Sequence, residues 1–274
     1  MNNFLKRTIF GSIYVALVVC SLLFAKPYFF QLVFITFAAF ATREFYLINH
    51  SSSATTIAGT ILAWLLFAAI STLLLTAYYK AAVILLTLYA FCLIATIVAE
   101  LFLKHNNPIR EWGLLLAGQI MIALPFALMN TIFAHSNILL LSLFIIIWLN
   151  DTGAYCIGSL LGKHKLFPRV SPGKTWEGTI GGAIFAIAAA YVLLTNTWQL
   201  TNLTFSNFQA LLLGTAIVIA ATLGDLTESL LKRQLGIKDS GNVLPGHGGF
   251  LDRFDSIILA TPILTILLTL IQTL

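Results

Sequence analysis

Long runs of apolar residues, separated by short polar segments, dominate this chain. An α-helix needs about 20 apolar residues to cross a hydrocarbon core of ~30 Å, and the runs reach that length. They lack the alternation of apolar and polar positions that is typical of transmembrane strands. The pattern therefore predicts about nine transmembrane helices, over residues 8–25, 28–48, 56–78, 80–103, 112–133, 137–160, 178–195, 208–231 and 256–273.

Composition supports a membrane protein. Of the 274 residues, 59% are apolar and 9% are charged, whereas an average soluble domain carries roughly 25% charged residues. A water-soluble surface cannot be built from so few charges. The apolar runs and the three cysteines also exclude a disordered, collagen-like or disulfide-stapled chain. The predicted fold class is all-α, a polytopic membrane helical bundle.

Basic residues predict how the bundle is oriented, because lysine and arginine are retained in short cytoplasmic loops. With the N-terminus inside, all but two of the 15 basic residues fall on the cytoplasmic side, the exceptions being Lys26 and Lys80. The C-terminus is then outside. The first run follows Lys6 and Arg7 and has no clear cleavage site before Lys26, so we interpret it as a retained anchor.

The charges divide the chain into two parts. Seven of the ten acidic residues lie between residues 151 and 255. We therefore interpret residues 1–136 as a transmembrane scaffold and 137–274 as a catalytic region with cytoplasmic loops at about 161–177 and 232–255. The acids of the first half, which include Glu44, Glu100 and Glu111, are expected near the ends of spans.

Candidate chemistry begins around the first long loop. Asp151 follows the apolar run that ends at Leu149, and either a site role or a polar contact at a helix end suits it. The segment 171–178, Ser-Pro-Gly-Lys-Thr-Trp-Glu-Gly, is expected to open the next span. There Ser171 or Thr175 could cap the helix, or the helix start could bind an anion. A P-loop is rejected, because it needs a glycine where Pro168 stands and a preceding strand, which we do not expect.

Four polar residues at helical spacing end the eighth span: Asp225, Glu228, Ser229 and Lys232. Offsets of 3, 4 and 7 place them on one helix face. A Glu228–Lys232 pair would neutralise itself. Asp225 then needs a cation from elsewhere in the chain.

The loop that follows is rich in glycine and in phosphate-binding donors. Lys238, His247 and Arg253 can donate to phosphate oxygens. Asp252 and Asp255 stand three residues apart where the last span begins. They could simply complement the helix dipole, but together with Asp225 they favour a carboxylate cluster that holds Mg²⁺.

The stretch from Ser229 to Asp255 resembles the signature of the phosphatidate cytidylyltransferases, also called CDP-diglyceride synthetases. The matching pattern is Ser, any residue, an aliphatic residue and Lys-Arg, then Lys-Asp, and later Pro-x-His-Gly-Gly-x-x-Asp-Arg-x-Asp. The segments 150–155 and 171–178 also look like blocks of this family. One departure is Gly173, where some members carry a second lysine. The motif-level resemblance covers about residues 150–256.

The resemblance implies an integral membrane enzyme of phospholipid biosynthesis that converts CTP and phosphatidate to CDP-diacylglycerol and pyrophosphate with Mg²⁺. The metal ligands would come from Asp225 and Asp252, with Asp255 and Asp151 as further candidates. Catalytic roles would fall to Asp225, Asp252, Lys238 and His247, where His247 either assists the leaving group or binds a loop carbonyl. Substrate contacts are expected from Ser171, Lys174, Thr175, Glu177, Lys232, Arg233, Asp239, Gly248, Gly249 and Arg253.

The resemblance also implies a location and partners. We expect a multi-pass protein of the bacterial plasma (inner) membrane, with its active site on the cytoplasmic side, where CTP is available. Basic residues there would concentrate the anionic lipid. The bilayer, CTP and phosphatidate are the expected partners, without nucleic acid, and a homodimer is left open.

Three other classes fit less well. An ion-coupled transporter should show charged or broken helices near the midplane in both halves, and the first half offers few. A non-catalytic assembly subunit would not need the acidic cluster and its basic, glycine-rich loops. A CDP-alcohol phosphotransferase would carry an Asp-Gly-x-x-Ala-Arg block, which is absent from this sequence.

Overall fold

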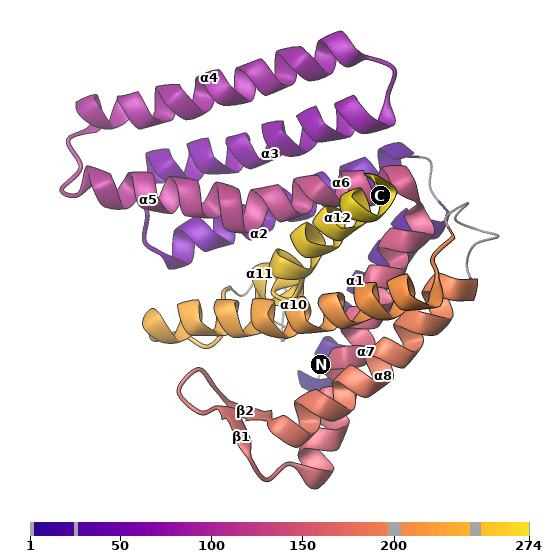
Figure 1. Cartoon of the computed structure of the whole chain (residues 1–274). Coiled ribbons are helices and arrows are strands. Elements are labelled where there is room, and N and C mark those ends of the chain that lie inside the picture. Colours follow the sequence, from indigo (N-terminus) through magenta and orange to yellow (C-terminus); the bar gives the residue numbers. More distant parts are fainter. Residues whose placement is uncertain (1–2, 25–26, 197–203, 242–247, 274) are drawn as a thin grey trace. The chain divides into compact units, whose positions relative to one another are not determined.

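The computed structural model describes residues 3–24, 27–196, 204–241 and 248–273, and its regular elements are mostly α-helices (Figure 1). The first half contains α1 (Asn3–Leu23), α2 (Pro27–Ile48), α3 (Ser53–Leu75), α4 (Tyr79–Leu103), α5 (Pro108–Gly118), the π-helical turn η1 (Gln119–Ala123) and α6 (Leu124–His135). The second half contains α7 (Asn137–Leu161), β1 (Lys165–Phe167), β2 (Ser171–Thr175), α8 (Trp176–Asn196), α10 (Asn207–Gln234), α11 (Leu251–Phe254) and α12 (Ile257–Thr273). The predicted all-α fold class is confirmed, with one small hairpin added.

Eight helical segments within the described residues are long and apolar enough to cross a membrane. They correspond to the second to ninth predicted spans, with α5 to α6 forming one span and α11 to α12 another. In α1 the apolar part, Ile9–Leu23, is shorter. The sides of the membrane on which the termini lie stay a prediction.

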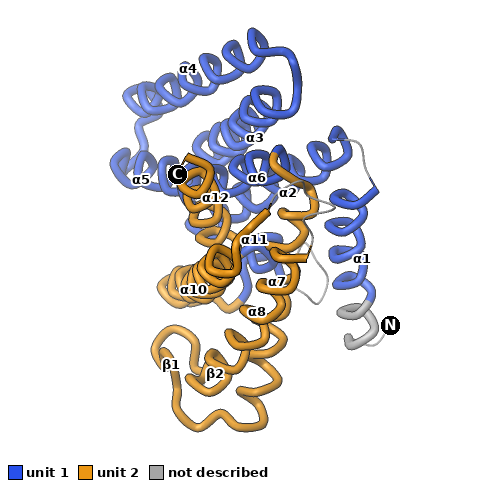
Figure 2. Tube along the Cα trace, turned by 45° about the vertical axis from the view of Figure 1, so that its right-hand side comes forward, with its two compact units in different colours: residues 1–134, 239–254 blue, residues 135–238, 255–274 orange. Residues whose placement is uncertain are grey.

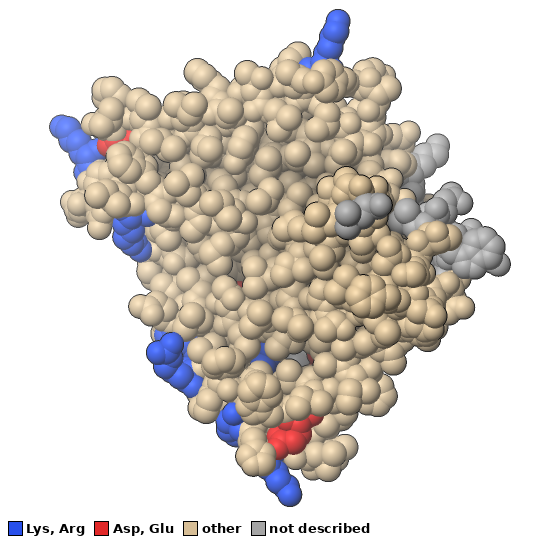
Figure 3. Space-filling view, viewed as in Figure 1, with Lys and Arg blue, Asp and Glu red and all other residues tan. Residues whose placement is uncertain are grey.

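Large apolar side chains are exposed along these helices. In α4 only Ala82 and Glu100 are buried, whereas Phe91 and Ile94 are exposed. Uncharged side chains cover nearly all of the face drawn in Figure 3. Such a surface is stable in lipid, where the helices satisfy their own backbone hydrogen bonds. The chain is therefore a multi-pass membrane protein.

The chain folds as two compact units (Figure 2). Unit 1 comprises residues 1–134 and 239–254, and unit 2 comprises residues 135–238 and 255–274. Most of the second predicted loop, 239–254, thus belongs with the helices of the first half. The catalytic role assigned to the C-terminal half stays a prediction.

A buried tyrosine ties three helical segments of unit 1 together. The Tyr46 hydroxyl donates to Leu115 O over 3.0 Å, and Gln119 Nε2 donates to that hydroxyl over 3.0 Å. The same amide group donates to Gly59 O over 2.9 Å. Because lipid offers no substitute partners, these bonds fix how α2, α3 and α5 pack.

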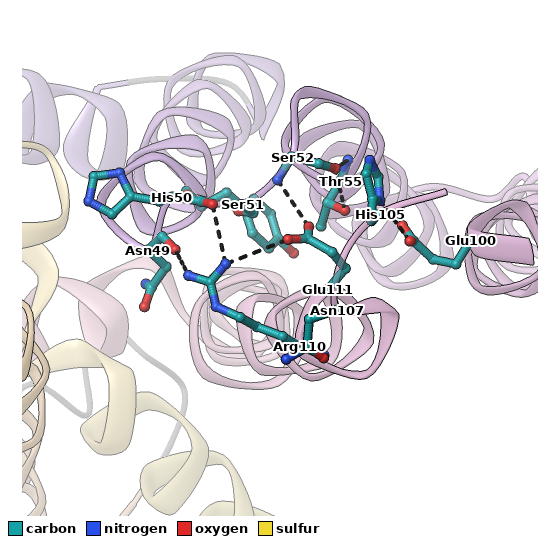
Figure 4. A network of polar contacts seen from close by, with 11 residues as sticks. Asn49, His50, Ser51, Ser52, Thr55, Glu100, His105, Asn107, Arg110 and Glu111 are labelled. Carbon is teal, nitrogen blue, oxygen red and sulfur yellow. Dashed lines mark hydrogen bonds and ion pairs between the residues drawn. The ribbon is translucent and has the colours of Figure 1, made fainter. Parts of the chain in front are cut away.

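A second polar network in unit 1 joins the turn between α2 and α3 to the start of α5 (Figure 4). Ser52 N donates to Glu111 Oε2 over 3.0 Å. Arg110 donates to the carbonyl oxygens of Asn49 and His50. Glu111, an acid of the first half, therefore serves helix packing.

Small residues let α7 and α8 of unit 2 approach closely. A Cβ atom on Gly182 would lie 2.5 Å from Asn150 O, and one on Gly178 would lie 2.6 Å from Ala154 O. Close backbone packing through small residues is common between transmembrane helices. It fixes the stretch of α7 in which Asp151 lies.

The hairpin of β1 and β2 corrects the expectation that no strand precedes Gly173. Lys165 pairs with Thr175, and Phe167 pairs with Ser171, in antiparallel register. The pairing satisfies backbone groups of a segment that the sequence analysis treated as loop. A P-loop is still excluded by Pro168.

The start of α8 agrees with the sequence analysis. The predicted span begins at residue 178, and α8 begins at Trp176. The Pro-Gly pair that precedes it forms helix poorly. Of the two predicted caps, Thr175 is the one that caps the helix, because Gly178 N donates to Thr175 Oγ1 over 3.2 Å.

Candidate active site

The polar residues predicted to share one face of α10 do so. Ser229 Oγ donates to Asp225 Oδ1 over 3.2 Å, and Lys232 forms an ion pair with Glu228 one helical turn away. Glu228 is 2% exposed, and burying a carboxylate is costly unless it is paired. The expected Glu228–Lys232 pair is therefore confirmed.

Asp225 receives its cation from β2. Lys174 Nζ lies 2.6 Å from Asp225 Oδ2, and both side chains are about one-quarter exposed. An ammonium and a carboxylate at this distance form a charge-assisted hydrogen bond. The partner that the sequence could not name for Asp225 is thus Lys174, a predicted phosphate-binding residue.

Further carboxylates of unit 2 interact electrostatically with one another. The partly buried Asp255 interacts electrostatically with Asp225, Glu228 and Asp151. Ser256 N donates to Asp255 Oδ1 over 2.6 Å. Asp151 and Asp225, two further residues proposed as metal ligands, therefore lie within electrostatic reach of Asp255.

A glycine determines how closely the last span approaches α10. A Cβ atom on Gly224 would lie 2.7 Å from Asp255 O and 3.0 Å from Ser256 O. Real Cβ atoms essentially never come so close to backbone oxygens. Gly224 therefore permits the approach that brings Asp255 towards Asp225.

Asp252 lies in unit 1 and holds two parts of the second loop. Its Oδ2 accepts hydrogen bonds from Ser240 N and Gly249 N, each over 2.8 Å. Gly248 has φ +82°, which a residue with a side chain adopts with strain. One oxygen of Asp252 is thus committed to the shape of this loop.

Sequence reasoning missed Glu44 of α2. Its Oε2 accepts hydrogen bonds from Leu251 N over 2.9 Å and from Ser240 Oγ over 3.2 Å, both within unit 1. The available signal was a carboxylate inside a predicted span, since such acids are functional by default. The expectation that Glu44 merely lies near a span end hid that signal.

Two predicted substrate contacts have partners around the hairpin. Glu177 accepts hydrogen bonds from Lys163 N over 3.1 Å and from His164 N over 3.2 Å. Arg233 Nε donates to Val170 O over 3.2 Å. These contacts hold the hairpin to α8 and to the end of α10, and a role towards substrate stays a prediction for both residues.

The remaining predicted residues lie around the second loop. Lys238 and Asp239 are exposed. Arg253 is partly buried, and its Nε has no hydrogen-bond partner among the described residues. His247 lies outside the described residues, so its role stays a prediction.

The oxygen-rich set in unit 2 suits a hard cation such as Mg²⁺. Yet among the described residues no three His, Cys, Asp or Glu side chains are grouped closely enough to hold a metal ion. The electrostatic interactions of Asp255 do not conflict with this result, because charges interact over longer distances than those at which ligands coordinate a metal ion. Mg²⁺ is commonly held by one or two carboxylates plus phosphate oxygens and water, which Asp225 and its neighbours fit.

The sequence is similar to those of known proteins. A model described as the cytidylyltransferase family matches residues 5–271. A protein of Haemophilus influenzae is 47% identical over 130 residues, which cover 47% of this chain and 44% of that protein. A protein of Staphylococcus haemolyticus is 53% identical over 126 residues, 46% of each chain, and one of Staphylococcus aureus is 46% identical over 133 residues, also 46% of each.

All three relatives are named phosphatidate cytidylyltransferase. The resemblance deduced from the motifs is confirmed. The aligned segments span less than half the length of these curated relatives.

Proposed function

Because the chain belongs to the cytidylyltransferase family, we propose that it transfers the cytidylyl group of CTP to phosphatidate, forming CDP-diacylglycerol and pyrophosphate. One structural observation supports this proposal above others. Lys174 and Ser229 both bind Asp225 in unit 2, with the Asp255 carboxyl nearby. A reaction between two polyanions needs cations that neutralise phosphate charge. Lysine side chains supply such cations directly, and carboxylates supply them by binding a divalent metal ion.

The nucleophile needs little activation. A phosphate monoester has a second pKa near 6, so phosphatidate is largely dianionic at neutral pH. One of its oxygens attacks the α-phosphorus of CTP, and the bond from that phosphorus to the bridging oxygen of the β-phosphate breaks. Pyrophosphate leaves with that oxygen. No residue has to act as a strong general base.

The chain's main task is then to position both anions and neutralise their charge. Lys174 is held at Asp225 and lies one-quarter exposed, so its ammonium can also donate to a phosphate oxygen. Lys232 neutralises Glu228. Arg233, Lys238 and Arg253 are the further candidates for contacts with the triphosphate and the lipid head group.

A divalent cation suits this set. Mg²⁺ bound at Asp225, with Asp255 and Asp151 as further candidates, would neutralise phosphate charge in the transition state. Ser229 orients Asp225 by donating to its Oδ1, which leaves Oδ2 to Lys174. The share of Asp252 in this ion stays a prediction.

The membrane setting fits a lipid substrate. Phosphatidate presents its phosphate at the bilayer surface, while its acyl chains stay in hydrocarbon. The basic loops are predicted on the cytoplasmic side of the bacterial inner membrane, where CTP is available. We expect a groove between helices, open sideways to the bilayer, through which the lipid enters.

The test uses the purified full chain in mixed micelles with phosphatidate, Mg²⁺ and CTP labelled in the cytosine ring. We expect the label to enter the organic phase only when phosphatidate is present, and the product to migrate as CDP-diacylglycerol. Diacylglycerol in place of phosphatidate should give no labelled lipid. If the label stays in the aqueous phase under all conditions, the proposed function is wrong.

A further inference from the structure

Glu44 connects the first half of the chain to the second loop. It lies on α2 and is 4% exposed. Its Oε2 accepts hydrogen bonds from Leu251 N and Ser240 Oγ, over 2.9 and 3.2 Å. These two donors stand on either side of residues 242–247, so a single oxygen atom links both flanks of the loop.

Asp252 binds the same loop from a second direction. Ser240 donates its backbone amide to Asp252 Oδ2 and its hydroxyl to Glu44 Oε2. Gly249 N also donates to Asp252 Oδ2, over 2.8 Å. Two buried carboxylates, from segments about 200 residues apart in the sequence, therefore hold Ser240 between them.

Two glycines of the loop make room for Glu44. A Cβ atom on Gly249 would lie 2.3 Å from Glu44 Oε2, and one on Gly241 would lie 2.6 Å from Glu44 Oε1. Oε1 has no hydrogen-bond partner among the described residues. The glycines of this motif are thus explained in part by the carboxylate that lies against them.

Aromatic side chains of α2 pack on the same loop. Phe40 stacks on Phe250 with ring centroids 5.0 Å apart, and Phe37 lies 5.6 Å from Phe250. These contacts place the loop on α2 but offer no partner to its backbone. The hydrogen bonds to the loop come from Glu44. A buried carboxylate is costly unless it is hydrogen-bonded, so Glu44 and the loop satisfy each other.

We propose that Glu44 is a positioning residue that holds the two flanks of this loop, residues 240–241 and 248–251, in the conformation needed for cytidylyl transfer. The inference rests on the proposed function, because it takes Asp252, which binds the same loop, to serve that reaction. Glu44 acts through the loop and touches neither substrate.

Three variants separate this role from a direct one. Glu44→Ala removes both hydrogen bonds, and we expect kcat/KM for CTP to fall at least tenfold. Glu44→Gln keeps one acceptor oxygen, which suffices because Oε2 alone accepts both bonds, so kcat/KM should stay within about threefold of wild type. Ser240→Ala removes only the hydroxyl contact and should have a two- to fivefold effect.

A double-mutant cycle distinguishes the positioning role from general destabilisation of the protein. It compares kcat/KM of the double variant with the values of the two single variants. Glu44→Ala combined with Ser240→Ala should be no more impaired than Glu44→Ala alone, because both changes break the same contact. Glu111→Ala is the matched control. This buried acid of unit 1, 7% exposed, binds Ser52 N and not the loop, so its effect should add to that of Ser240→Ala.

Hydrogen exchange of the wild type and variants tests the positioning without any turnover. In Glu44→Ala the amides of residues 248–254 should exchange at least tenfold faster, whereas Glu111→Ala should accelerate exchange only around residues 49–55. An inactive wild-type protein would contradict the proposed function, while exchange would still test Glu44. Unchanged exchange in Glu44→Ala, or Glu44→Gln as impaired as Glu44→Ala in an active enzyme, would overturn the inference.

Discussion

At the scale of single residues, Asp225 is distinguished by its partners. Lys174 and Ser229 each bind one of its oxygens, although they come from β2 and from α10 itself. Helical spacing predicts the Ser229 contact, because it connects residues one turn apart. The Lys174 contact could not be predicted, because it depends on how the hairpin folds over α10.

Asp225→Asn should lower turnover about a hundredfold, because it removes the charge that binds Lys174 and a divalent cation. The half-saturating concentration of Mg²⁺ should rise in any activity that remains, and chelation with EDTA should abolish wild-type turnover until Mg²⁺ is restored. Glu100→Gln is the control, since Glu100 pairs with His105 in unit 1 and should leave turnover near wild type. Turnover of Asp225→Asn close to that of wild type would remove Asp225 from the site.

The Asp252→Asn variant separates the structural role of Asp252, which is to hold the loop, from its predicted role in the reaction. An asparagine can keep an oxygen for Ser240 N and Gly249 N, so the loop should retain its protection against hydrogen exchange. Turnover should nevertheless be lost if the charge of Asp252 serves the reaction, as predicted. Asp252→Ala should lose both. An active Asp252→Asn protein with a protected loop would show that Asp252 is purely structural.

At the scale of elements, apolar run length predicts the helices well, because a span must cover the hydrocarbon core. The hairpin was missed because β1 and β2 are short and pair through backbone groups, which leave little trace in the sequence. The loop over Glu44 was missed for a different reason. Its contacts join residues about 200 positions apart, and no local pattern reveals such a pairing.

Helix packing in unit 1 gives a test at this scale. A Cβ atom on Gly59 would lie 2.3 Å from the ring of Tyr46, which its hydrogen bonds hold in place. Gly59→Ala should therefore destabilise the protein by roughly 1–3 kcal/mol, seen as a lower thermal unfolding midpoint in detergent. Gly113→Ala, where nothing lies within 4 Å of the new Cβ, should leave the midpoint unchanged or higher. Equal midpoints for the two variants would refute the packing argument.

At the scale of the whole molecule, the chain is a multi-pass protein whose motif from Ser229 to Asp255 is divided between two units. The first half was interpreted as scaffold from its low charge. Glu44 shows why that interpretation is incomplete, since one buried acid is enough to bind a distant loop. The number of charged residues in a segment shows where acids are concentrated in the sequence. It does not show which single acid contacts a distant loop.

Orientation in the membrane is also testable at this scale. Basic residues are retained in cytoplasmic loops, which predicts that the N-terminus is inside. Because nine is an odd number of crossings, the C-terminus is then outside. A pair of reporters fused after residue 274, one active only in the periplasm and one only in the cytoplasm, should report the periplasm. A cytoplasmic signal would contradict the predicted nine crossings.

The reaction itself is tested most directly by following two phosphates of CTP. With phosphatidate as acceptor, ³²P in the α-position should appear in the lipid, and ³²P in the γ-position should appear in pyrophosphate. Label from the γ-position in the lipid would identify a lipid kinase and contradict cytidylyl transfer.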